Sequence, residues 1–199
     1  MPSITRPFRP KLAYSADRGE TAAPCLTPHQ AERFRAEVMP HMDAAYRFAR
    51  YLVGDAAAAE DIVQNAFVRA FRGFPSFHGQ APKAWLLAIV RNCCFDWAKA
   101  NRMPLADDNA ALEEVIDPET PETILARKAE AAMVRETVAH LPEPFRETLV
   151  LRELEDLSYK EIATLTEVPL GTVMSRLARA REMFARLLPA AVRAGGNVA

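Results

Sequence analysis

The sequence predicts an all-α protein made of two small helical domains joined by a flexible acidic linker, with a helix-turn-helix in the second domain. Half of the 199 residues are hydrophobic, which is enough for packed cores. The chain has 15 prolines and 7 glycines. Its apolar residues recur every three or four positions and not in strict alternation, which favours helices punctuated by proline over strands.

Breaks in the helical pattern divide the chain into five segments. Residues 1–26 are rich in proline and lack periodicity, so we expect little fixed structure there. A first helical domain is expected over 27–102 and a second over 122–189. The acidic segment 103–121 between them has no helical stripe of useful length and is interpreted as a linker. Residues 190–199 form a short tail.

Local signals place the first helix and its end. Thr27, Pro28 and Gln30 combine a cap, a proline suited to the first helical position and a capping-box partner. Pro40 predicts a break or kink. Gly54 predicts the end of this helical stretch, because glycine is common just after a helix.

Two more helices complete the first domain. Asp55 is a cap for the second helix, and a loop from Gly73 to Pro82 separates it from a third helix that runs from about Lys83 to Asn101. The expected buried positions are Ala59, Ile62, Val63, Ala66, Phe67 and Ala70 in the second helix, and Leu86, Ile89, Val90 and Cys93 in the third.

The second domain ends in a helix-turn-helix pattern. Helices resume at about Glu122, and a helix from Phe145 to Leu154 follows a turn marked by prolines. Ser158 and Glu161 then form a capping box. The turn over 167–169 precedes a helix whose apolar stripe is Val173, Leu177, Ala180 and Phe184.

This stripe leaves Thr172, Ser175, Arg176 and Arg179 on another face of the last helix. A short helix, a tight turn and a helix with a basic outer face have the geometry that reads the major groove of DNA. The alternative is an ordinary helical hairpin with solvated arginines.

The net charge of −1 conceals an uneven distribution of charge. Residues 103–126 carry seven acidic and no basic side chains, whereas residues 168–199 carry five basic and one acidic. A basic C-terminal block is therefore compatible with binding to nucleic acid.

Several classes of protein are disfavoured. No apolar run approaches the roughly 18 residues of a membrane span. No signal peptide, phosphate loop or catalytic motif is present, and the weak pair Cys25 and His29 is the only one with the spacing of zinc ligands. We expect a reduced, cytoplasmic protein that is not an enzyme and needs no cofactor or metal. Cys93 and Cys94 point about 100° apart on a helix, so we expect one in the core and the other half-exposed. A redox role for them stays open.

The order of short motifs resembles regions 2 and 4 of the extracytoplasmic-function (ECF) sigma factors of the sigma-70 family. The resemblance covers roughly residues 34–188 and rests on matching residues in both halves. In the first half these are Asp61-Ile62-Val63-Gln64-Asn65-Ala66-Phe67, Trp85-Leu86, Ile89, Arg91-Asn92 and Asp96. In the second they are Leu141-Pro142, Arg146, Leu151-Arg152, Ser158-Tyr159, Glu161-Ile162-Ala163, Gly171-Thr172-Val173, Ser175-Arg176-Leu177 and Arg179-Ala180-Arg181.

The resemblance implies a transcription initiation factor that binds core RNA polymerase and promoter DNA, with an anti-sigma factor as a further partner. Region 2 would bind the polymerase clamp and melt the minus-ten element, and region 4 would read the minus-thirty-five element. By matching position, Asp61, Gln64 and Asn65 would face the polymerase. Their spacing also puts them on one polar helix face, and the alternative is a solvated face.

The resemblance and the chemistry of the side chains supply two sets of candidate DNA contacts. The minus-ten set is Phe74, Phe77, His78, Gln80, Lys83, Arg91, Lys99 and Arg102. The minus-thirty-five set is Ser158, Tyr159, Lys160, Thr172, Ser175, Arg176 and Arg179. Core packing is an equal alternative for Phe74 and Phe77. Trp97, Ala98 and Ala100 depart from the family, which frequently has arginine there.

The acidic linker has two interpretations. By resemblance it would occupy a basic channel of the polymerase, and the alternative is a solubilising tether. Two rival functions also remain at the level of the sequence. One is a helix-turn-helix regulator that acts without polymerase, and the other is a sigma-like decoy that binds an anti-sigma factor.

Overall fold

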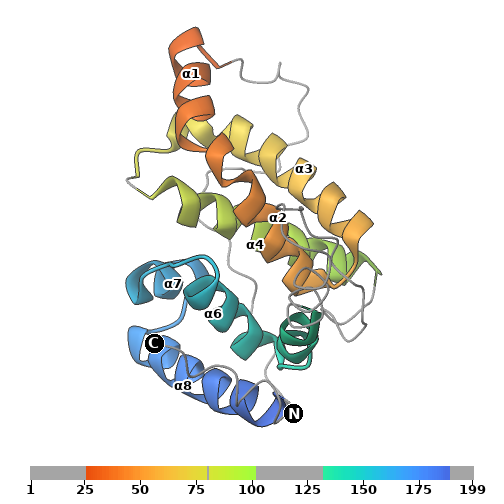
Figure 1. The fold of residues 1–199 in the computed structure, drawn as a ribbon. Coiled ribbons are helices and arrows are strands. Elements are labelled where there is room, and N and C mark those ends of the chain that lie inside the picture. The colour runs from red at the N-terminus through yellow and green to blue at the C-terminus, as the bar shows by residue number, and fades with distance from the viewer. Residues whose placement is uncertain (1–25, 80, 102–131, 189–199) are drawn as a thin grey trace, which may run out of the picture.

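The computed structural model describes residues 26–79, 81–101 and 132–188. Every regular element among these residues is helical, and no strand occurs in them, which confirms the prediction of an all-α fold. The elements form two units (Figure 1). We call residues 26–101 the N-terminal unit and residues 132–188 the C-terminal unit.

The N-terminal unit begins with α1 (Pro28–Glu37), a 3-10 turn η1 (Met39–His41) and α2 (Met42–Val53). The predicted capping box forms, with the Thr27 hydroxyl accepting from the Gln30 amide and the Gln30 side chain accepting from the Thr27 amide. The predicted break at Pro40 is confirmed as well, because this proline lies in the 3-10 turn that separates α1 from α2.

Helices α3 (Ala56–Gly73) and α4 (Pro82–Asn101) complete this unit, with a short 3-10 turn η2 (Phe74–Ser76) between them. Gly54 ends α2 in the left-handed conformation, with φ of 79°, which glycine adopts without strain. The Asp55 carboxylate then accepts a hydrogen bond from the Ala58 amide at 2.6 Å and caps α3. Both signals were predicted from the sequence.

The C-terminal unit contains a helical segment over 132–139, α6 (Glu143–Glu153), α7 (Tyr159–Thr166) and α8 (Leu170–Leu187). Helix α6 begins two residues before the predicted start at Phe145. Pro142 occupies its N-cap and Pro144 lies in its first turn, where the missing amide would have had no helical partner.

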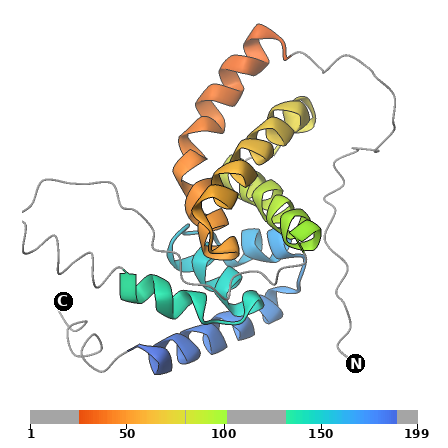
Figure 2. The ribbon, with the colours of Figure 1, turned by 90° about the vertical axis from the view of Figure 1, so that its right-hand side faces the viewer.

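The two units pack directly against each other. Helix α2 lies against α6, and α4 lies against α7. Figures 1 and 2 both show α6, α7 and α8 beneath the helices of the N-terminal unit, while α1 extends away from the junction. One continuous cluster of buried apolar side chains runs through both units.

This packing corrects the expectation for the two adjacent cysteines. Cys93 and Cys94 are both buried, with 4% and 0% of their surface exposed. The prediction of one half-exposed thiol is wrong, because α4 packs against α2 and α3 on one side and against α7 on another. Burial raises the pKa of the Cys93 thiol to about 11 and that of Cys94 well above its ordinary value.

Some predicted segments lie outside the described residues, namely residues 1–25, the linker 103–121 and the tail 190–199. Leu26 belongs to the buried core. None of the described helices has the length and apolarity to cross a membrane. Within the described ranges, no group of three or more His, Cys, Asp or Glu side chains is arranged to hold a metal ion.

Candidate nucleic-acid interface

The start of α7 is fixed by the predicted capping box. The Glu161 amide donates to the Ser158 hydroxyl at 3.3 Å, and the Glu161 carboxylate accepts from the Ser158 amide at 2.8 Å. The Ser158 hydroxyl also donates to the Glu161 carboxylate. Ser158 therefore holds the end of this helix, while its side chain stays exposed.

The turn between α7 and α8 depends on one left-handed residue. Glu167 has φ of 53° and ends α7, with its amide donating to the carbonyl of Ala163. Pro169 then sits at the N-cap of α8 with no side-chain cap. The turn sets the angle between the two helices, which is the feature that lets the second helix of such a motif enter a groove.

The buried face of α8 is the one that the sequence predicts. Val173, Leu177 and Ala180 are buried, and Phe184 is half-buried against the same core. The predicted polar side chains lie outside this stripe. Ser175 and Arg179 are exposed, and Thr172 and Arg176 are half-buried.

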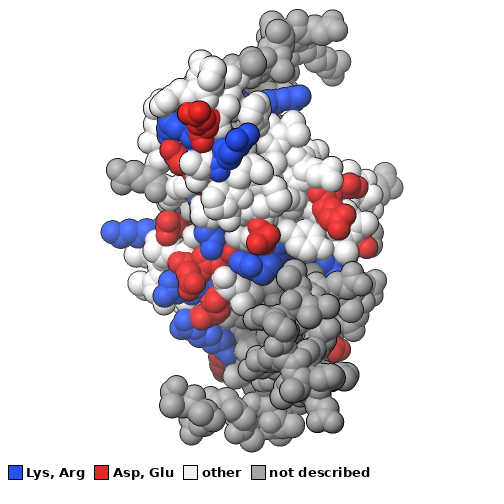
Figure 3. Space-filling view, turned by 45° about the horizontal axis from the view of Figure 1, so that its top comes forward, with Lys and Arg blue, Asp and Glu red and all other residues white. Residues whose placement is uncertain are grey.

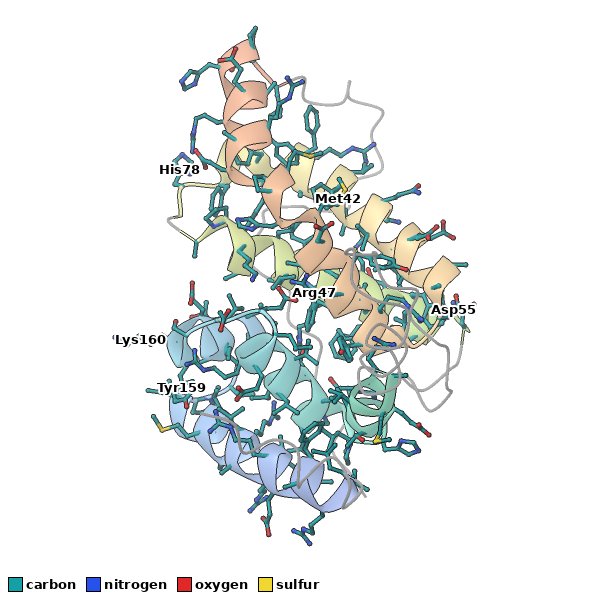
Figure 4. All side chains as sticks on the ribbon, in the orientation of Figure 1. Met42, Arg47, Asp55, His78, Tyr159 and Lys160 are labelled. Carbon is teal, nitrogen blue, oxygen red and sulfur yellow. The ribbon has the colours of Figure 1, made fainter. Side chains whose placement is uncertain are left out.

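The surroundings of this face include the acidic Glu143 and, at the start of α7, Tyr159 and Lys160. Burial and then the negative charge of Glu147 raise the pKa of Glu143, and Arg176 is the weakest of three arginines that oppose this shift. Tyr159 is half-buried, with the Arg152 guanidinium 5.3 Å from its ring centroid. Lys160, beside it at the start of α7, is exposed (Figure 4).

The candidate polymerase contacts lie together on α3. Asp61, Gln64 and Asn65 are all exposed. The Asn65 side-chain oxygen accepts from Arg69 at 3.0 Å, and Arg69 pairs with Asp96 of α4 at 2.8 Å. This polar face is thus anchored to the neighbouring helix by a surface ion pair.

The aromatic side chains of the candidate minus-ten set are part of the core. Phe74 and Phe77 stack with ring centroids 5.9 Å apart, and Trp85 lies 4.6 Å from Phe77. Phe34 of α1 meets Phe74 edge-to-face at 5.3 Å. Because both phenylalanines are buried, neither ring is available to stack on a base, and core packing accounts for them.

The polar members of the same set are divided between solvent and the unit junction. Lys99 and His78 are exposed, and the His78 Nδ1 atom lies 2.9 Å from the Ser76 carbonyl oxygen. Gln80 and Arg102 lie outside the described residues. Lys83 and Arg91 face the C-terminal unit, where each meets a buried carboxylate.

The first of these carboxylates is Glu155, between α6 and α7. Arg47 of α2 donates to it through two nitrogens, at 3.0 and 3.2 Å. Lys83 Nζ lies 2.9 Å from a Glu155 carboxylate oxygen and donates to the Glu155 carbonyl at 2.8 Å. The Glu155 side chain has no exposed surface, and Arg47 lies on α2 at the level where the units meet (Figure 4).

The second buried carboxylate is Glu147 of α6, which pairs with Arg91 of α4. Their side chains are 1% and 11% exposed. The Arg91 guanidinium also lies 4.6 Å from the Phe95 ring centroid. Figure 3 shows that cationic and anionic side chains are similarly intermixed on the described surface of one face.

His41 adds a titratable group beside the Glu155 pairs. Its pKa is lowered, first by partial burial and then by the positive charge of Lys83, while Glu155 opposes the shift.

Three residues at the junction of the units were not predicted from the sequence: Arg47, Glu147 and Glu155. Their partners lie 56 to 108 positions away in the chain. No local spacing, cap or periodicity reports such a contact, since it exists only once the units have packed.

Comparison with protein-family models gives two matches. Residues 38–103 match the model described as sigma-70 region 2, and residues 131–184 match the model described as sigma-70, region 4. They fall in the order that the sequence motifs indicate.

Curated relatives are RNA polymerase sigma factors. The chain is 38% identical over 146 residues to an RNA polymerase sigma-H factor of Pseudomonas aeruginosa, covering 68% of this chain and 76% of that protein. It is 37% identical over 134 residues to an ECF RNA polymerase sigma-E factor of Haemophilus influenzae, covering 62% and 71%.

Solved structures share the fold. A sigma factor RpoE in complex with the anti-sigma factor NepR from Bartonella quintana matches with a TM-score of 0.66 and 23% identity, over 79% of this chain and 97% of that one. CnrH in complex with the cytosolic domain of CnrY matches with a TM-score of 0.56 and 26% identity, over 79% and 88%. The chain therefore belongs to the ECF sigma factors of the sigma-70 family, which are transcription initiation factors.

Proposed function

We propose that this chain binds core RNA polymerase through α3 and directs it to promoters that α7 and α8 help to select. The observation that carries the proposal is the presence, in one chain, of an exposed polar face on α3 and a helix-turn-helix whose second helix carries the half-buried Arg176 and the exposed Arg179. The match of residues 38–103 to sigma-70 region 2 disfavours a regulator that acts without polymerase. In this proposal the chain catalyses no reaction itself, needs no cofactor and acts in the cytoplasm.

The proposed minus-ten surface is narrower than the sequence analysis suggested. His78, Lys83, Arg91 and Lys99 supply charge and edge contacts. Gln80 and Arg102 stay in the proposal on the resemblance alone, and the buried Phe74 and Phe77 leave it. Melting a base step costs a few kcal/mol, which contacts to the separated strand must offset.

The proposed minus-thirty-five surface consists of the polar face of α8 and the start of α7. Arg176 lies in the second turn of α8, the part of a recognition helix that contacts bases. Thr172, Ser175 and Arg179 flank it, and Lys160 is placed for a phosphate. Ser158 supports this surface by capping α7, and Tyr159, the first residue of that helix, stays a candidate contact.

The proposed domain limits are 27–102 for region 2 and 122–189 for region 4, with residues 103–121 as an acidic tether. We also propose an anti-sigma factor as a regulatory partner. Support comes from the two matched structures: in one, a sigma factor is bound to an anti-sigma factor, and in the other CnrH is bound to the cytosolic domain of CnrY.

The proposal is tested by transcription in vitro with core polymerase on a genomic DNA pool, followed by mapping of transcript starts. The chain should produce starts that core polymerase alone does not, preceded by common minus-ten and minus-thirty-five sequences. Asp61→Lys should weaken binding to core without unfolding the protein, because exposed helix positions tolerate substitution within about ±0.5 kcal/mol.

Asp43→Lys is the matched control. It makes the same charge reversal at another exposed position of the same unit, and it should leave binding to core intact. Equal binding of wild type and Asp61→Lys would refute the assignment of the α3 face, and an absence of new starts with the wild-type chain would refute the function.

A further inference from the structure

We propose that the junction is an autoinhibitory latch, in which Glu147 and Glu155 of the C-terminal unit occupy cations that the N-terminal unit needs for promoter DNA. The inhibitory role rests on the proposed function, whereas the latch itself rests on the contacts. Lys83 and Arg91 belong to the proposed minus-ten surface, and both are paired across the junction.

The carboxylates act as stand-ins for phosphates. A guanidinium binds a carboxylate or a phosphate with the same forked set of donors, so one excludes the other. Arg91 directs two nitrogens at Glu147. Lys83 places its ammonium between the Glu155 carboxylate and carbonyl oxygens. In this arrangement the donors that make these contacts are not free to bind a nucleic acid.

The ion pairs of Glu147 and Glu155 favour one arrangement of the units and still allow the units to separate. The Glu155 and Glu147 side chains are almost fully buried, and their burial costs desolvation energy that the ion pairs largely repay. Arg47 and Lys83 keep 48% and 27% of their side-chain surface exposed, so all the charged groups can return to water when the units separate. Such pairs fix one arrangement of the units more than they add net stability.

The closed arrangement also excludes binding to both promoter elements at once. Elements centred near minus ten and minus thirty-five are about 25 base pairs apart, or about 85 Å at 3.4 Å per base pair. A unit of this size has a radius of gyration of about 11 Å. Two such units in direct contact cannot span that separation, so the junction must open before both elements are engaged.

The latch is tested on the full chain by measuring the distance between its units. Spin labels at Ala57→Cys on α3 and Ala185→Cys on α8 occupy exposed positions, and Cys25→Ser in the background removes the cysteine that lies outside the described residues. The parent should give mainly one short, narrow distance. Glu155→Gln should raise the ratio of open to closed molecules about tenfold or more, since removing one partner of a buried ion pair strongly disfavours the closed state.

Glu153→Gln is the matched control. Glu153 pairs with Arg181 inside the C-terminal unit, so the same change two positions away should leave the distance unaltered. Arg47→Gln removes one of the two cations paired with Glu155 and should shift the distance in the same direction as Glu155→Gln. Far-UV circular dichroism establishes that each variant is folded, and Arg47→Gln carries the test should Glu155→Gln be unfolded.

The functional readout is affinity for core polymerase and yield of open promoter complexes. If most parent molecules are closed, Glu155→Gln should raise apparent affinity in proportion to the gain in open molecules. Unchanged distances in both Glu155→Gln and Arg47→Gln would overturn the latch. Opening without any gain in affinity or open complexes would overturn its inhibitory role. Failure of the wild-type chain to initiate transcription refutes the proposed function instead, and leaves the distance measurement standing.

Discussion

Arg176 is the residue whose side chain we expect to read sequence. It lies in the second turn of α8, half-buried at the edge of the stripe that contains Val173 and Leu177. Arg176→Ala should cost roughly 1–3 kcal/mol on the preferred minus-thirty-five element and relax specificity at one or two positions. Competition binding of the holoenzyme to a library of minus-thirty-five sequences measures both effects.

Arg186→Ala is the control for this prediction. Arg186 lies at the last turn of α8 and pairs with Glu182 at 2.8 Å, away from the part of the helix that reads bases. Its loss should leave the order of preferred sequences unchanged. If Arg176→Ala also leaves that order unchanged, the recognition face has been misplaced.

Cys93 and Cys94 are predicted to be chemically inert in the folded protein. With a pKa of about 11 for Cys93, about one thiol in a thousand is ionised at pH 8, and burial raises the pKa of Cys94 as well. In a Cys25→Ser background, a thiol reagent should label neither cysteine until denaturant is added. Rapid labelling of the native protein would reopen a redox role for the pair.

At the scale of the element, the left-handed backbone of Glu167 strains the turn of the helix-turn-helix, and a substitution should relieve this strain. A left-handed residue with a Cβ costs roughly 1–2 kcal/mol relative to its right-handed form, and glycine avoids most of this. Glu167→Gly should therefore raise the free energy of unfolding by about 0.5–1 kcal/mol, seen as a higher urea midpoint with an unchanged slope. Glu167→Ala keeps the Cβ and should give no gain, so an equal gain from alanine would exclude relief of strain as the cause.

Helix boundaries were predictable from the sequence because their causes are local. Thr27, Asp55 and Ser158 cap the helices that they were expected to cap, and Gly54 ends α2. The start of α6 was predicted two residues too late, because the sequence interpretation took Pro142 and Pro144 only as a turn. Proline is also well suited to a first helical turn.

Contacts between units were not predictable in the same way. A helical stripe indicates that a face is buried but not what covers it, so the second buried side of α4, with Cys94, was missed. The same reason applies to Lys83 and Arg91. Their charge suggested DNA, and only the packed structure places them beside Glu155 and Glu147.

At the scale of the whole molecule, the shared apolar cluster should couple the stability of the two units. Both tryptophans, Trp85 and Trp97, lie on α4 of the N-terminal unit. Leu177→Ala in the C-terminal unit removes a side chain that is 2% exposed, which typically costs about 2–5 kcal/mol. Tryptophan fluorescence should therefore report a lower melting temperature for the N-terminal unit as well.

Met174→Ala provides the control for coupling. It shortens a side chain on the same helix that is 48% exposed, and it should shift the fluorescence transition much less. If Leu177→Ala lowers the transition seen by circular dichroism but leaves the tryptophan transition in place, the two units melt independently.

Because α4 is both a core helix of one unit and the surface on which the other unit rests, the two halves are not interchangeable modules. A chimaera that takes residues 132–188 from a relative would set unfamiliar side chains against Arg47, Lys83 and Arg91. Such hybrids would differ from either parent in their resting activity even with every DNA-reading residue intact. Swapping specificities between members of this family therefore calls for transplanting the α4 face together with the recognition helix.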